Sequence, residues 1–92
     1  MTTRKITVLG RKNHAEAMRV AAGLTIYGHE VRLIIMNEKV AENDENSKMA
    51  ELLELAEIVP ETTVSEMDDD LKYLDSIELS KVLIESEQII NI

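Results

Sequence analysis

Two aliphatic runs separated by a helical pattern dominate the first third of the chain. Apolar side chains fill most of positions 6–9, and a second apolar run follows at positions 31–36. Continuous apolar runs are typical of parallel strands, because crossover helices bury both faces of a parallel sheet. The segment between them carries small apolar residues at the 3.6-residue spacing of an amphipathic helix. The pattern therefore predicts a βαβ unit from Lys5 to Met36.

The ends of this first helix are well marked. Asn13 is suited to the N-cap position, and Glu16, three residues later, completes the pattern of a capping box. Gly28 suits the left-handed position that follows a helix C-terminus. We interpret Gly23, in the middle of the helix, as a site of close backbone packing. The predicted sheet-facing residues are mostly small: Ala17, Met18, Val20, Ala21, Ala22 and Leu24.

The middle of the chain has weaker signals. Residues 37–46 are polar without apolar periodicity, which predicts a loop, and Ser47 then caps a second helix over residues 48–56. Ile58 and Val59 predict a short third strand that Pro60 ends, since proline cannot donate to a strand ladder. Residues 71–74 predict a small fourth strand.

The last third of the chain predicts a helix and a final strand. Asp75 or Ser76 begins the helix, with Glu78 placed to complete a second capping box. Residues 88–92 are mainly aliphatic and predict a strand that we expect to be buried, because an exposed aliphatic edge promotes aggregation. The helix residues expected to face the sheet are Ile77, Leu79, Val82 and Leu83.

The order of these elements predicts the fold class. Strands that alternate with helices indicate an α/β protein, here a three-layer α/β/α sandwich around a parallel sheet of four to five strands. The 92 residues form a single domain, residues 1–92. Ligands of such folds bind beyond the carboxyl ends of the strands, where the strand order reverses. The loop Gly10–His14 is predicted to lie at that edge.

Composition excludes several classes of function. The chain has no cysteine, which rules out disulfides, thiolate nucleophiles and cysteine-based metal sites in this chain. Its net charge of −8 and its two aromatic residues argue against a nucleic-acid partner, which needs cations for phosphates and rings for stacking. No apolar run approaches the ~20 residues that span a bilayer, and the N-terminus lacks a signal-peptide pattern. We therefore expect a cytoplasmic protein without a membrane partner.

The charge is unevenly distributed. Residues 1–32 hold six basic and two acidic side chains, a net +4, whereas residues 37–92 hold four basic and sixteen acidic ones, a net −12. Either these charges simply solvate the surface, or they steer anions and let copies of the chain meet. A small aliphatic core with edges to protect favours the second interpretation. We predict a homo-oligomer, either a dimer or a trimer.

The first loop is the main candidate for chemistry. Amides at a helix N-terminus beside two cations are the ingredients of an anion site, and the candidate residues are Gly10, Arg11, Lys12, Asn13 and His14. The loop lacks both the dinucleotide fingerprint and the P-loop pattern, so an ordinary solvated connection stays open as the alternative. His14 has no recognisable nucleophile or orienting partner, and no cofactor is predicted.

Two other polar features are interpreted as structural. His29 follows the first helix at the opposite end of the sheet, so the two histidines are not expected to share a site. Asp68, Asp69 and Asp70 are consecutive and lack the spaced ligands and the glycine of a calcium loop. We interpret them as a solvated acidic turn and predict no metal site.

The chain contains the segments AEAMRVAAGLTIYGHEV, AELLELA, VPETTV and LDSIELSKVLIESEQIINI. Together these segments resemble the DsrE/DsrF/DsrH family of small sulfur-relay proteins. The resemblance implies a five-stranded parallel sheet and a tendency to form homo- or hetero-oligomers. Relay members of that family carry sulfur on a cysteine in a loop at the carboxyl edge of the sheet, where this chain has residues 60–63, Pro-Glu-Thr-Thr.

Two functional hypotheses follow. The first is a cysteine-free DsrE-like subunit, not an enzyme, that oligomerises and modulates a sulfur-transfer or redox partner. The second is a protein or enzyme that binds a small anion or nucleotide through the Gly10–His14 loop.

Overall fold

The computed structural model describes residues 3–92, which form five strands and three α-helices in an α/β sandwich of the flavodoxin-like kind. All five strands are parallel, as the aliphatic runs predicted. None of the helices in these residues is long and apolar enough to cross a bilayer. The elements in chain order are β1 (Lys5–Gly10), α1 (His14–Ile26), β2 (Glu30–Ile35), α2 (Asp44–Leu55), β3 (Glu61–Thr62), a 3₁₀ turn η1 (Ser65–Met67), β4 (Lys72–Tyr73), α3 (Ser76–Glu85) and β5 (Gln88–Asn91).

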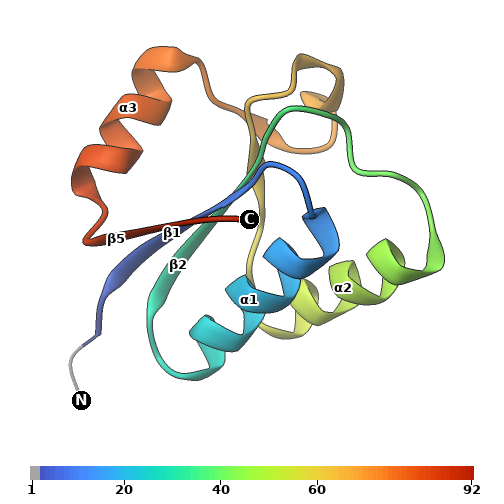
Figure 1. The fold of residues 1–92 in the computed structure, drawn as a ribbon, viewed down its shortest axis with the longest axis horizontal. Helices are drawn as coiled ribbons and strands as arrows, with labels where there is room; N and C mark the ends of the chain where they lie inside the picture. Colours follow the sequence, from blue (N-terminus) through green and yellow to red (C-terminus); the bar gives the residue numbers. More distant parts are fainter. Residues whose placement is uncertain (1–2) are drawn as a thin grey trace.

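The strand order in the sheet is β4-β3-β2-β1-β5. The chain moves outward from β1 to β4 and then returns through α3 to place β5 on the other side of β1. The order therefore reverses between β1 and β5, and β5 forms one edge of the sheet. Figure 1 views the sheet nearly edge-on, with α1 and α2 on one face and α3 on the other.

The two faces of the sheet have separate hydrophobic cores of unequal size. The larger core lies under α1 and α2, where Ala17, Ala21 and Ala22 let α1 lie close to Val8 and Leu33 of the sheet. The smaller core lies under α3, and its buried members are Leu9, Ile34, Leu74 and Val82. The alanine-rich face predicted for α1 is confirmed.

The caps of α1 agree only in part with those predicted from the sequence. The Asn13 side chain accepts a hydrogen bond from the Glu16 amide, as predicted. The Glu16 carboxylate pairs instead with Arg19, whose guanidinium lowers the pKa of that carboxyl. Gly28 has a φ of +92°, which confirms the left-handed turn. A side chain built at Gly23 would meet nothing within 4 Å, so the prediction of close packing there is wrong.

The second helix and third strand differ from the prediction. Helix α2 begins at Asp44 and is capped by Asn43, because acidic residues in its first turn suit the helix dipole even without apolar periodicity. Strand β3 comprises Glu61 and Thr62 and so follows Pro60. Proline is tolerated before a strand, where its missing N–H is not needed. The aliphatic pair at 58–59 lies outside the strand.

Helix α3 and strand β5 correct two expectations about burial. The capping box of Asp75 and Glu78 is confirmed. Ile77, which was expected to face the sheet, is 68% exposed, because Leu79, Val82 and Leu83 form the inward side of the helix. Strand β5 is an edge strand whose Ile89 is 41% exposed, so its predicted burial is only partial.

Candidate functional site

The carboxyl edge of the sheet, between β1 and β5, is the first candidate site. The strand order reverses there, and the loop from Gly10 to His14 lies at this point. The position expected from sequence is therefore the position in the structure. A shallow hollow of about 210 Å³ at the same point is lined by Arg11, Lys12, Asn91 and Ile92.

Much of the polar backbone of this loop is used by the protein itself. The amides of Lys12 and Asn13 both donate to the carbonyl oxygen of Ile92, each at 3.2 Å. Arg11 Nε donates to Asn91 Oδ1 at 3.0 Å, which ties the loop to β5 a second time. The side chains of Arg11 and Lys12 are what the loop presents to a ligand. Phosphate-binding loops are selective because several free backbone amides surround the phosphate. The amides of Lys12 and Asn13 are bonded to Ile92 and do not form such a cradle.

A polar hollow of about 260 Å³ lies beside the same loop, where α1 and α2 begin. Its cations, Lys12 and Lys39, are matched by the carboxylates of Glu38 and Glu45. Because the formal charges cancel, the hollow does not attract anions through its net charge. This arrangement gives the anion hypothesis less electrostatic support than the sequence suggested.

Both histidines make hydrogen bonds within the protein. His14 is buried, and its Nε2 lies 3.3 Å from the carbonyl oxygen of Met36, to which it donates. His29 lies after α1, where its Nδ1 accepts a hydrogen bond from the Arg4 amide. Within residues 3–92, no group of three acidic or histidine side chains could hold a metal ion.

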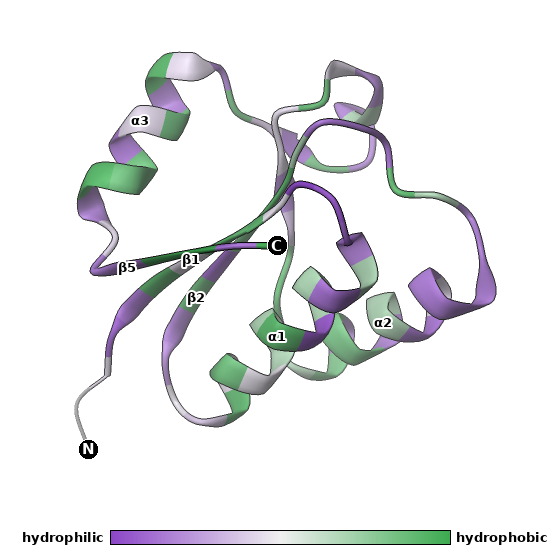
Figure 2. Cartoon of the chain, in the orientation of Figure 1, coloured by the Kyte–Doolittle hydropathy of each residue, from purple (hydrophilic) through white to green (hydrophobic). Residues whose placement is uncertain are grey.

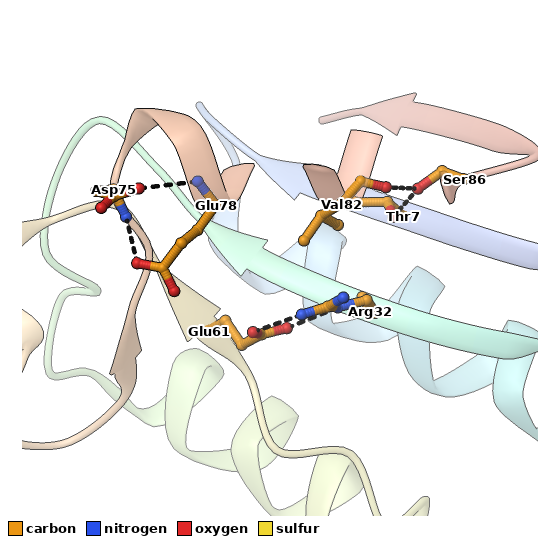
Figure 3. A network of polar contacts seen from close by, with 7 residues as sticks. All are labelled: Thr7, Arg32, Glu61, Asp75, Glu78, Val82 and Ser86. Atoms are coloured by element: carbon orange, nitrogen blue, oxygen red, sulfur yellow. Dashed lines mark hydrogen bonds and ion pairs between the residues drawn. The ribbon is translucent and has the colours of Figure 1, made fainter. Parts of the chain in front are cut away.

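A third hollow, of about 320 Å³, lies under α3 and over the amino ends of β1 and β2. Figure 3 shows the polar contacts around it: Arg32 of β2 reaches Glu61 of β3 through two bonds of 2.9 and 2.8 Å. The carboxylate of Glu61 raises the pKa of the Arg32 guanidinium, and Glu85 of α3 adds to this effect. Thr7 bonds to the Ser86 hydroxyl, which donates to the Val82 carbonyl. These contacts connect the strands to one another and to the end of α3, so we interpret the network as structural.

The Arg32–Glu61 pair should contribute measurably to stability. We expect a coupling free energy of about 1 kcal/mol in a double-mutant cycle with Arg32→Met and Glu61→Gln, because the bond is bidentate but Arg32 is partly exposed. Urea denaturation of the four proteins measures it. The exposed Arg19–Glu16 pair of α1 is the matched control and should show weaker coupling. Equal coupling in the two pairs would contradict this structural role.

Thr62 fixes the segment that follows β3. Its side chain is fully buried, and Oγ1 donates to the Ile35 carbonyl at 3.0 Å while accepting from the Val64 amide at 2.9 Å. The hydroxyl therefore links β3 to β2 and shapes the turn into η1. At this part of the carboxyl edge, Thr62 therefore has a structural role.

Sequence reasoning missed an exposed aliphatic surface on α3 and β5. Ile77 and Ile84 are 68% and 83% exposed, and Ile89 of β5 is also exposed. Figure 2 shows hydrophobic segments on both elements. The seven-residue spacing of Ile77 and Ile84 was a usable signal, since such residues share one helix face. Ile77 was instead assigned to the core.

No protein-family model, no curated protein and no solved structure matches this chain.

Proposed function

We propose that this chain is a non-catalytic assembly subunit, which oligomerises and modulates a sulfur-transfer or redox partner. The observation that carries the assembly role is the exposed aliphatic surface of α3 and β5, defined by Ile77, Ile84 and Ile89. Exposed apolar side chains that gather beside a free strand edge mark interaction sites in soluble proteins.

The sulfur-related part of the proposal rests on the resemblance to the DsrE/DsrF/DsrH proteins. The five-stranded parallel sheet is the architecture that this resemblance implies. The chain has no cysteine, and Thr62 near the carboxyl edge is committed to hydrogen bonds with Ile35 and Val64. Such a chain cannot carry a persulfide itself. Its role in a relay is then to hold or regulate a partner that does.

Capture of partners from the source cells tests this function. A tagged chain should retain a protein with a reactive cysteine, and the purified pair should bind directly. Adding the chain should change the rate at which that partner passes on a persulfide, measured by the mass of the acceptor. A captured partner without sulfur or redox chemistry, or a transfer rate unchanged at saturating chain, would contradict the proposal.

A ligand screen tests the competing function. Anion binding through Arg11 and Lys12 predicts that phosphate, sulfite or nucleotides raise the melting temperature, because a ligand of the folded state stabilises it by RT ln(1 + [L]/Kd). We expect no shift at millimolar anion. A shift that disappears in Arg11→Gln/Lys12→Gln would favour the anion-binding function over the assembly role.

A further inference from the structure

The two edges of the sheet are protected very differently. Strand β4 has two residues, one of them Lys72, and follows an acidic run at 68–70. Short length and charge are the usual ways to prevent an edge from pairing with another strand. Strand β5 has four residues, Gln88–Asn91, without a charge or a proline. It is the edge at which a further strand fits.

The hydrogen-bonding groups of β5 alternate between β1 and solvent. The Ile92 amide donates to the Leu9 carbonyl, and in the register of β5 with β1 the amides of Gln88 and Ile90 point the same way, so the amides of Ile89 and Asn91 are expected to point away from β1. Ile89 pairs in register with Thr7, whose side chain bonds to Ser86, the residue that follows α3. Ile89 therefore faces the same side of the sheet as α3.

Helix α3, which leads into this edge strand, exposes an aliphatic side. Successive helix residues are about 100° apart, so Ile77 and Ile84 lie together, away from the inward residues Leu79 and Val82. Glu85 lines the hollow over β2, and Ile84 lies about 100° from it around the helix. Ile77 and Ile84 thus face mainly away from the sheet, and Ile84 is turned away from β2, toward the β5 side.

The charges beside β5 make this edge complementary to itself. Glu87 precedes the strand, and Arg11 lies at the other end, where its Nε bonds to Asn91. In an antiparallel pair of two β5 strands centred on Ile89, Gln88 of one copy faces Ile90 of the other, and Glu87 faces Asn91. Each Glu87 then approaches Arg11 of the second copy, so the contact has an opposite-charge pair at both ends.

We propose that two copies of this chain join through β5, which forms a continuous antiparallel junction with Ile89 on the two-fold axis and the two α3 helices side by side. This proposal rests on the assembly role proposed above and identifies its first partner as a second copy. The operation keeps α3 on the same face in both copies, so the two α3 helices lie on either side of the axis and the exposed Ile84 of each lies beside the junction. The same patch serves both subunits, as in other two-fold interfaces.

Sedimentation equilibrium across micromolar to millimolar concentrations tests the dimer. We expect a monomer–dimer equilibrium, with the dissociation constant raised at least tenfold by Ile84→Glu and by Ile89→Lys, because each would bury an unpaired charge. Ile26→Glu is the matched control: Ile26 is 72% exposed, on α1 at the other face, and should leave the constant unchanged. Circular dichroism confirms that all variants fold.

A charge cycle and hydrogen exchange test the register. Glu87→Arg and Arg11→Glu should each weaken the dimer, and the double variant should recover most of the loss. The amides of Ile89 and Asn91 should exchange more slowly as protein concentration rises. A monomer throughout, a trimer, or a dimer insensitive to Ile84→Glu and Ile89→Lys would each overturn the proposal.

These outcomes separate the dimer from the proposed function. A monomeric chain that still binds a sulfur-transfer partner would exclude the proposed dimer and leave the proposed function standing. A dimeric chain that binds no such partner would remove the sulfur-related role and leave the β5 junction intact.

Discussion

Replacing Leu74 with alanine is expected to lower the free energy of unfolding by about 2–5 kcal/mol. Leu74 is 2% exposed although it directly follows a two-residue strand. It is one of four buried side chains in the core under α3, so few neighbours can move into the space that the substitution leaves. Urea denaturation, with the midpoint and slope measured separately, gives the change.

Leu55 provides the matched control for this prediction. It is 83% exposed at the end of α2, and Leu55→Ala should change stability by less than about 0.5 kcal/mol. If the two substitutions had equal effects, α3 would not be packed on the sheet through Leu74. The test thus examines the smaller of the two cores, on which the position of α3 and of the β5 edge depends.

The second large effect is expected at Gly28. Its φ of +92° is a backbone conformation that glycine adopts freely and residues with a Cβ avoid. Gly28→Val should destabilise the protein by more than about 1 kcal/mol, since β-branched residues are least tolerant of positive φ. Space is not the reason, because a Cβ at this position would meet nothing within 4 Å. An unchanged denaturation midpoint would show that the turn between α1 and β2 is built differently.

Gly23 provides a control at which the expected change in stability has the opposite sign. It lies inside α1, where a Cβ would also meet nothing within 4 Å. Gly23→Ala should therefore stabilise the protein by about 0.5–1 kcal/mol, because alanine restricts the unfolded chain and favours the helix. Loss of stability in this variant would mean that α1 is more crowded at Gly23 than the structure shows.

The candidate site was predictable in position but not in chemistry. The loop at Gly10–His14 could be placed at the carboxyl edge from strand and helix periodicity alone. The hydrogen bonds from Lys12 and Asn13 to Ile92 join residues that are 80 and 79 positions apart in the chain. No local pattern encodes them, because they depend on β5 pairing with β1.

Elements whose signals are local could be identified from the amino-acid sequence. The buried parallel strands β1 and β2, the Asn13 and Asp75 caps, and the turn at Gly28 each depend on the periodicity or backbone preference of a few adjacent residues. These interactions form within one element, so a pattern in the sequence is sufficient to identify them.

The tertiary structure alone decided the features that depend on distant partners. Glu61 and Thr62 form β3 because Arg32 and the Ile35 carbonyl bind them, whereas the more aliphatic pair before Pro60 lacks those partners. Ile77 is apolar yet exposed, because a helix packs on a sheet through one side only. Which side that is, and which strand edge is left unpaired, is decided by the packing of α3 over β1 and β2.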